Sequence, residues 1–336
     1  MDTHRVDFVC NDAPVTVDVV PGESLLSVLR ERLGLRAAKD GCAPQGQCGC
    51  CTVLVDGKAR VACVTPVTRV AGRRVTTLEG LDAARRDALA AAFLDAGASQ
   101  CGFCTPGILL RAAALEDRGR DDFADAERAL AAHLCRCTGW RSVVEAVSGA
   151  APRPGRRDLD AAGARAALEG GVPQRVGADV PLGAGGFADD GAPADALVAV
   201  PRPPGSSAES VDAVGAAWVV AETLGEARAR AAPTPGRRTT RREGPPLPLP
   251  ERVPGGVRLA TSWVEPAYLE PDASWCEPGG APASPLANGG AFGGKTTSLA
   301  PAAAEALSAR LGRPVRVVYA REDVVRLGPK RPPVAA

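Results

Sequence analysis

The chain has 336 residues, and its 40 basic residues nearly balance its 39 acidic ones, which leaves a formal net charge of +1. Such a balance gives no overall field to attract a nucleic acid or an anionic membrane surface, so we expect neither as a partner. No stretch approaches the ~20 apolar residues that span a bilayer, and the first ten residues lack the basic-then-apolar order of a signal peptide. We therefore expect a cytoplasmic protein with room for two or three domains.

The eleven cysteines are the most informative feature of the composition, and ten of them precede residue 138. In a reducing compartment, closely grouped thiolates hold metal more often than they form disulfides. The sequence therefore predicts metal chemistry in the first half of the chain.

The first 78 residues carry the period-two pattern of strands around a single helix. Apolar residues from Leu25 to Leu33 make one face of that helix, which Gly34 ends. Asn11-Asp12 and Asp56-Gly57 are typical hairpin turns. Strands are expected at residues 5–10, 14–20, 52–55, 59–63 and 73–78. Two hairpins and one helix indicate a β-grasp, ferredoxin-like domain over residues 1–78.

From Asp82 the apolar period changes to 3.6, which is typical of helices. Thr105-Pro106 places a capping residue before a proline, and Thr138 can cap a further helix. Helices are expected at residues 83–96, 106–117, 122–133 and 139–148. These predict a compact four-helix bundle over residues 79–150.

The remaining residues are weakly patterned. Residues 150–160 and 233–256 are rich in Pro, Gly and Arg, which is typical of linkers. Only a helix at 298–311 and a buried strand at 314–319 stand out. We expect a linker-rich segment over 151–255 and a short α/β segment over 256–336, together poorly able to close a core.

The first group of cysteines lies in a glycine-rich loop and beyond one hairpin. The spacing is C-x5-C-x2-C-x11-C, formed by Cys42, Cys48, Cys51 and Cys63. Four thiolates suit a [2Fe-2S] cluster, and nearby glycines let backbone N–H groups approach its sulfurs. The loop resembles that of plant-type ferredoxins, although their first gap is usually four residues. Cys50 is the alternative to Cys51 as a ligand, and a zinc site is the alternative to the cluster.

The second group lies before two predicted helices. QCGFCTPG contains Cys101 and Cys104, and LCRCTGW contains Cys135 and Cys137. Helix N-termini carry partial positive charge and free N–H groups, which favour an anionic thiolate cluster between them. The pattern predicts a second [2Fe-2S] cluster.

With the ferredoxin-type loop upstream, these two segments resemble the molybdenum hydroxylase family of xanthine oxidase, aldehyde oxidoreductase and carbon monoxide dehydrogenase. The resemblance implies that the second cluster lies next to molybdopterin, with Gln100 and Cys137 at positions that contact the pterin. It also implies that the first cluster passes electrons on to flavin. His133 stands where the family usually has Asn, and Trp140 stands where it usually has Tyr; neither position is a ligand in the family.

The segment GGAFGGK at residues 289–295 resembles a loop of the family's molybdenum subunit. That resemblance implies contacts with molybdopterin from Gly290, Phe292 and Gly293. It also makes residues 151–336 look like a truncated molybdopterin-binding region. The alternative is a phosphate-binding loop, because Gly289, Gly294, Lys295 and Thr296 fit G-x4-G-K-T, but that motif needs a strand directly before it and the preceding residues are not strand-like.

Together these features predict an α+β oxidoreductase component that transfers electrons and carries two [2Fe-2S] clusters. We find no flavin domain and no counterpart of the family's active-site glutamate, so no catalytic residue is identified. The resemblance implies two partners, a molybdopterin-binding subunit together with an FAD-binding subunit. The alternatives are a molybdopterin-dependent hydroxylase active by itself and a zinc-stabilised interaction module.

Overall fold

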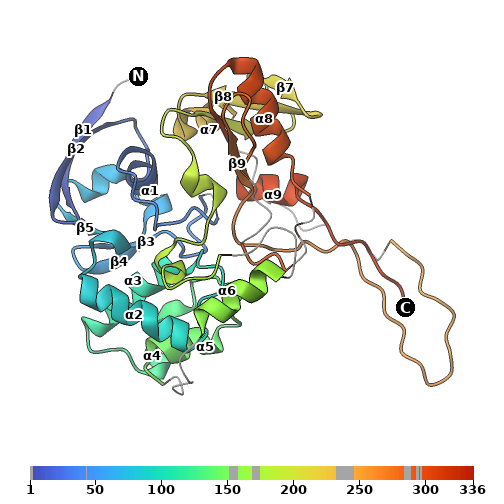
Figure 1. The fold of residues 1–336 in the computed structure, drawn as a ribbon, viewed down its shortest axis with the longest axis horizontal. Helices are drawn as coiled ribbons and strands as arrows, with labels where there is room; N and C mark the ends of the chain where they lie inside the picture. Colours follow the sequence, from blue (N-terminus) through green and yellow to red (C-terminus); the bar gives the residue numbers. More distant parts are fainter. Residues whose placement is uncertain are drawn as a thin grey trace.

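A computed structural model describes residues 3–42, 44–150, 158–168, 175–231, 246–283, 289–292, 295 and 297–336. The first half forms a sheet with helices below it, and the second half forms another sheet beside it (Figure 1). Within the described part of the chain, no helix is both long and apolar enough to cross a membrane.

The first sheet has five strands in the order β2-β1-β5-β3-β4. Its strands are β1 (His4–Cys10), β2 (Ala13–Val19), β3 (Thr52–Val55), β4 (Lys58–Val61) and β5 (Arg74–Thr76). The hairpin between β1 and β2 turns at Asn11 and Asp12, whose φ angles of 50° and 64° suit these residue types. The five predicted strands are confirmed. β4 ends two residues early because residues 62–64 form a 3-10 turn, which carries Cys63.

The predicted helix after the first hairpin is confirmed, and its second part is a π-helical turn, which is wider than an α-helical turn. It begins as α1 (Leu25–Ser27), where the Ser24 side chain accepts a hydrogen bond from the backbone N–H of Ser27. It continues as a π-helical turn, η1 (Val28–Arg32), and this turn buries Arg30.

The four helices expected below the sheet are also confirmed. They are α2 (Ala83–Asp95), α3 (Thr105–Glu116), α4 (Phe123–Leu130) and α5 (Arg141–Val147). α3 is the central helix, since nearly all of its residues are buried and it packs against β3. One continuous apolar core joins the sheet to these helices. The position of the loops before α3 and α5 relative to the sheet is therefore fixed by side-chain packing.

The expectation that the second half could not close a core is wrong. It forms a five-stranded sheet in the order β7-β8-β6-β10-β9. Its elements are α6 (Leu159–Leu168), β6 (Leu197–Pro201), β7 (Val211–Ala213), β8 (Ala216–Ala221), α7 (Leu224–Ala231), β9 (Ala273–Cys276), α8 (Ala300–Leu311), β10 (Val315–Val318) and α9 (Arg321–Leu327). Trp218, Tyr268 and Tyr319 are fully buried in and around this sheet. Of the expected linkers at residues 150–160 and 233–256, residues 151–157 and 233–245 lie outside the described residues, and α6 already begins at Leu159.

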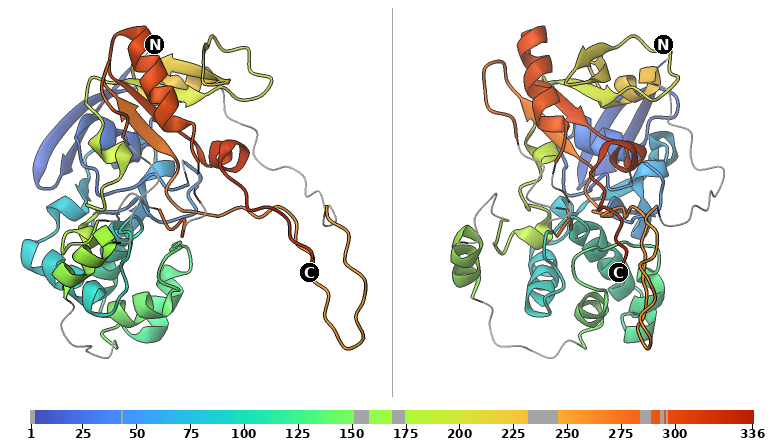
Figure 2. Two further views of the ribbon diagram at one scale, coloured as in Figure 1. Left: turned by 45° about the vertical axis from the view of Figure 1, so that its right-hand side comes forward. Right: turned by 90° about the vertical axis from the view of Figure 1, so that its right-hand side faces the viewer.

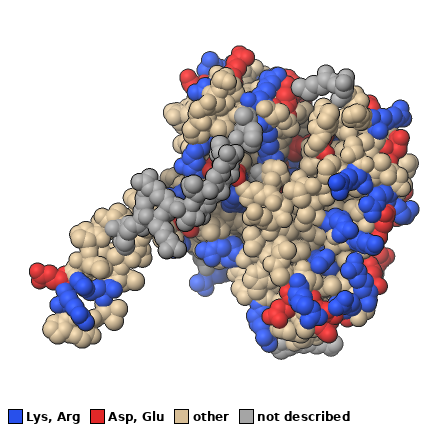
Figure 3. Space-filling model, turned by 180° about the vertical axis from the view of Figure 1, so that it is seen from behind, with Lys and Arg blue, Asp and Glu red and all other residues tan. Residues whose placement is uncertain are grey.

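Residues 246–266 and the last residues of the chain extend away from both sheets as a paired arm (Figure 2). Bridges between Ala260 and Ala335 and between Val264 and Arg331 hold its two segments together. On the face of the molecule seen in Figure 3, basic and acidic side chains are intermingled.

Candidate metal centres

The first group of cysteines gathers where the loop after η1 meets the turn after β4. The hairpin of β3 and β4 brings Cys63 back to Cys51, and the Cys63 backbone N–H donates to the Cys51 sulfur at 3.4 Å. The Gln45 N–H donates to the Cys42 sulfur at 3.2 Å. Cys42, Cys48, Cys51 and Cys63 are all buried. The four sequence-predicted ligands of this group therefore lie together.

These thiols are close enough to change one another's protonation. Hydrogen bonds from Cys48 and Cys63 hold the pKa of Cys42 far below that of an ordinary thiol. The same contacts with Cys42 raise the pKa values of Cys48 and Cys63, and Cys63 also contacts Cys51. Metal ions bind thiolates and displace such shared protons, so the close contacts among these thiols suit a metal ion.

Cys50 makes different contacts from Cys51. Its thiol is buried. The Cys50 sulfur lies 3.8 Å from the Cys48 carbonyl oxygen and also contacts the Cys48 side chain. Its backbone lies against the first turn of α3, because a Cβ placed on Gly107 would lie 3.1 Å from the Cys50 carbonyl carbon. Cys51, in contrast, faces Cys63.

The second group of cysteines forms two close pairs at the starts of α3 and α5. The sulfurs of Cys101 and Cys137 are 3.5 Å apart. A hydrogen bond from Cys104 lowers the pKa of Cys135 to about 5, and Thr138 also contacts that sulfur at 3.1 Å. Cys101 and Cys104 are buried, whereas Cys135 and Cys137 are half-buried.

The distances between the cysteine sulfurs distinguish a two-iron cluster from a single zinc ion. All four sulfurs around one tetrahedral ion lie at similar short distances from one another. In a two-iron cluster each iron takes two of the four cysteines, so the sulfurs approach in pairs. Cys101 with Cys137, and Cys104 with Cys135, fit the paired arrangement.

A tightly packed contact joins the two cysteine groups. The Leu134 N–H donates to the Cys48 carbonyl at 2.9 Å, which links the loop before α5 to the first group. His133 is buried beside it, with its Nε2 atom 3.3 Å from the Thr52 hydroxyl. Burial lowers the pKa of His133 to about 4, so the imidazole is neutral near pH 7. His133 is thus a packing residue at this junction.

Gly49→Ala is expected to reduce the metal content of the first group. A Cβ on Gly49 would lie 2.4 Å from the His133 ring, and the residue has a φ of +71°. The matched control is Gly57→Ala, because Gly57 has a φ of +70° but no atom within 4 Å of its Cβ position. Both variants carry a backbone strain of roughly 1 kcal/mol, so only Gly49→Ala adds a collision. Metal analysis of both proteins checks this; equal metal content would show that the contact with His133 is unimportant.

The residues predicted to contact molybdopterin are only partly brought together. A Cβ on Gly290 would lie 3.2 Å from the Cys137 sulfur, so the loop approaches the second group closely there. Gln100 is exposed, and the Phe292 side chain is 57% exposed. Gly293 lies outside the described residues.

Lys295 argues against the phosphate-binding alternative. Its ammonium group is buried, 3.2 Å from the Asp272 carboxylate and 4.6 Å from the centre of the Tyr268 ring. A phosphate-binding lysine must instead reach its ligand. No strand occurs in residues 277–283, the described segment before this loop.

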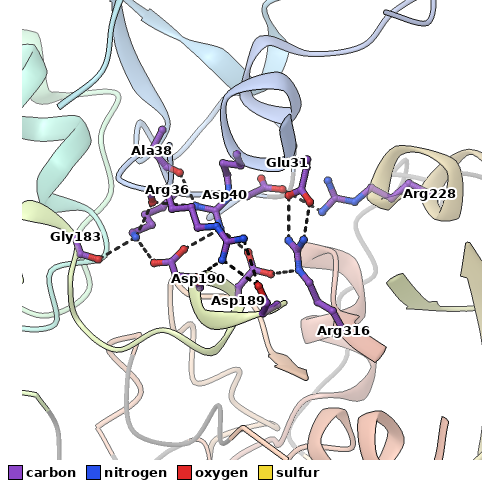
Figure 4. A network of polar contacts seen from close by, with 12 residues as sticks. Glu31, Arg36, Ala38, Asp40, Gly183, Asp189, Asp190, Arg228 and Arg316 are labelled. Atoms are coloured by element: carbon purple, nitrogen blue, oxygen red, sulfur yellow. Dashed lines mark hydrogen bonds and ion pairs between the residues drawn. The ribbon is translucent and has the colours of Figure 1, made fainter. Parts of the chain in front are cut away.

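Sequence reasoning missed a network of ion pairs that joins the two halves of the chain (Figure 4). Arg30 pairs with Asp189 at 2.7 Å and with Asp190 at 2.9 Å. Arg316 pairs with Asp189 at 2.7 Å and with Glu31 at 2.6 Å. No local pattern marks these residues, because the partners are more than 120 positions apart in the chain.

Comparison with known proteins gives a consistent picture of the first half. Residues 8–68 match the family described as "2Fe-2S iron-sulfur cluster binding domain", and residues 77–148 match the "[2Fe-2S] binding domain" family. A nicotinate dehydrogenase subunit of Pseudomonas putida is 43% identical over 148 residues, which are 44% of this chain and 94% of that protein. The xanthine dehydrogenase iron-sulfur-binding subunit of Escherichia coli is 37% identical over 150 residues, which are 44% of this chain and 93% of that protein.

The likeness in fold extends through the second half. The solved aldehyde oxidoreductase of Desulfovibrio gigas superposes on 98% of this chain with a TM-score of 0.70 and 22% sequence identity. This chain spans about half of that protein, since the match covers 51% of it. From its two iron-sulfur domains and these relatives, the chain belongs to the molybdenum hydroxylase family, as an iron-sulfur electron-transfer component of an oxidoreductase.

Proposed function

We propose that this chain holds two [2Fe-2S] clusters and passes single electrons from one to the other. The observation that carries the proposal is that eight cysteines gather into two groups, and that the sulfurs of the second group lie in two pairs. The proposed ligands are Cys42, Cys48, Cys51 and Cys63 for the first cluster and Cys101, Cys104, Cys135 and Cys137 for the second. The contact between Cys51 and Cys63 supports Cys51 over Cys50 as a ligand.

The surroundings of the cysteines suit a relay. The N–H groups of Gln45 and Cys63 already point at ligand sulfurs, and such bonds stabilise the negative charge of a cluster. The hydrogen bond from Leu134 to Cys48 and the shared core keep the two groups at one separation. Electron transfer between clusters needs burial and fixed spacing more than it needs reactive side chains.

We infer a domain layout from the same features. The first sheet with α1 supports a β-grasp, ferredoxin-like domain at residues 1–78, and α2 to α5 support a helical cluster domain at 79–150. The fold of the second sheet supports a relation to part of a molybdopterin-binding region. Strands from residues 151–255 and 256–336 share this sheet, so we propose that the two segments form one region, with the GGAFGGK loop in the second segment.

The partners follow from the relatives. The relative from Escherichia coli is named as one subunit, which supports a separate molybdopterin-binding subunit together with a separate FAD-binding subunit for this chain. When bound, molybdopterin would supply the oxidation of the substrate. Gln100, Cys137, Gly290, Phe292 and Gly293 are the residues proposed to face the pterin. None of the eleven cysteines is paired in a disulfide, which supports a location in the reducing cytoplasm.

A reductive titration tests the relay. The purified protein should take up one electron per cluster, or about two per chain, and develop two S = 1/2 EPR signals of about one spin each. A zinc-stabilised module would take up no electrons. Molybdenum that co-purifies with substrate-dependent reduction of the clusters would favour the self-contained hydroxylase.

A further inference from the structure

We propose that residues 179–190, called the cover below, shield the second cluster from water and thereby hold its reduction potential low. The cover comes from the second half of the chain, beyond the residues that match the iron-sulfur families. The inference rests on the proposed function, because it assigns a role toward a cluster bound by Cys101, Cys104, Cys135 and Cys137.

Backbone contacts show how closely the cover approaches the cysteine loop. A Cβ on Gly102 would lie 2.2 Å from the Val180 carbonyl oxygen, and a Cβ on Gly185 would lie 2.4 Å from the Cys101 carbonyl oxygen. Two glycines, one on each side, are therefore needed for this approach. The cover lies directly on the loop that carries two of the ligands.

An aromatic contact also covers the loop that carries Cys101 and Cys104. Phe187 of the cover is 3% exposed and packs edge-on against Phe103, with ring centroids 5.1 Å apart. Phe103 lies between Cys101 and Cys104, which are the buried ligands of this group. Cys135 and Cys137, on the other loop of the site, are half-buried. Protection from water is greatest on the side where the cover lies.

Ion pairs connect Asp189 and Asp190, at the C-terminal end of the cover, to the first half of the chain. Arg30, whose side chain is 5% exposed, holds Asp189 and Asp190. The Lys39 ammonium group contacts Asp190, donates to the Gly183 carbonyl at 3.0 Å and lies 5.0 Å from the centre of the Phe187 ring. These buried cations are oriented by several partners, so the cover has one fixed position.

Shielding has a predictable electrostatic effect. Reduction adds a negative charge to a cluster, and nearby water stabilises that charge more than a low-dielectric protein interior does. A second cluster that loses its cover should therefore be easier to reduce. The first cluster provides an internal reference in the same molecule.

Gly185→Ala tests the cover in the full-length chain with both clusters loaded. The added methyl group collides with the Cys101 backbone and should lift the cover. The matched control is Gly191→Ala. The nearest atom to its added Cβ would lie in the Trp275 ring at 3.4 Å, so this variant adds a methyl group without a collision. We expect Gly185→Ala to shift the midpoint potential of the second cluster upward. It should also increase the deuterium modulation of that cluster's pulsed-EPR signal after exchange into D2O, and Gly191→Ala should do neither.

The outcomes separate this inference from the proposed function. If the wild-type protein lacks two clusters, the proposed function fails. If it holds both, and Gly185→Ala matches the wild type in potential and deuterium modulation, only the role of the cover is overturned. Should Gly185→Ala fail to fold, Phe187→Ala tests the same shielding and should shift the same two quantities in the same direction. An unchanged second cluster in that variant would equally overturn the inference.

Discussion

Cys48→Ser is expected to remove the first cluster and leave the second intact. Cys48 is buried and contacts Cys42, so it belongs to the first group alone. The second group has its own four cysteines and its own two helix starts. Iron content should fall from about four to about two atoms per chain, and one of the two S = 1/2 signals should disappear. Loss of both signals, or of neither, would contradict the grouping of the ligands.

Cys50→Ser is the matched control, because it changes a neighbouring buried thiol in the same loop. We expect it to keep both clusters, since the Cys50 sulfur lies 3.8 Å from the Cys48 carbonyl oxygen, whereas Cys51 is the neighbour that contacts Cys63. Cys51→Ser should behave like Cys48→Ser, because its sulfur accepts the hydrogen bond from the Cys63 backbone. If the results for Cys50 and Cys51 were exchanged, the ligand would be Cys50.

Arg316→Met is expected to destabilise the folded chain by about 3 kcal/mol, because it leaves the half-buried carboxylate of Glu31 without a cation and leaves Asp189 paired with Arg30 alone. The Arg316 side chain is 8% exposed and pairs with Glu31 of the first half and Asp189 of the second. Urea unfolding at neutral pH measures the free energy of unfolding of the variant and the wild type. The control is Arg313→Met, whose partner Glu222 is exposed and whose loss should cost at most about 1 kcal/mol. Equal effects of the two variants would show that the network adds no stability.

The same network predicts a loss of stability in acid. Burial alone would raise the pKa of Asp189, but the guanidinium groups of Arg316 and Arg30 outweigh it and hold that pKa well below its usual range. A carboxyl with a lowered pKa stabilises the fold above its unfolded pKa of about 4, and this stability is lost as the pH falls further. Arg316→Met should weaken this pH dependence. Urea unfolding repeated between neutral pH and pH 3 checks the slope.

The iron-sulfur half was predictable because its signals are local. Each cysteine motif lies within one loop, and Thr105-Pro106 marks the start of the helix beside it. The hairpin turn at Asp56-Gly57 indicates that Cys63 returns to the loop containing Cys51. Spacing along the chain therefore sorts the eight cysteines into the same two groups as the fold does.

In the second half the helix at 298–311 and the strand at 314–319 were predicted from the sequence, as α8 and β10 confirm. The arrangement of the sheet was not predictable, because its strand order depends on distant pairing. β6 pairs in parallel with β10, so residues 197–199 lie beside residues 315–317. All four residues of β10 are buried, so its sequence indicates a buried strand but does not indicate which strands lie beside it. The contacts of the cover were not predictable from the sequence for the same reason. Asp189 and Arg30 are 159 positions apart, and in the sequence Gly185 cannot be told from a turn glycine.

The most direct test of the central claim is the iron, acid-labile sulfide and zinc content of anaerobically purified protein. Two clusters on eight cysteines require about four iron and about four sulfide per chain, with negligible zinc. A protein that contains no iron after reconstitution, or that holds two zinc ions in its place, would contradict the account.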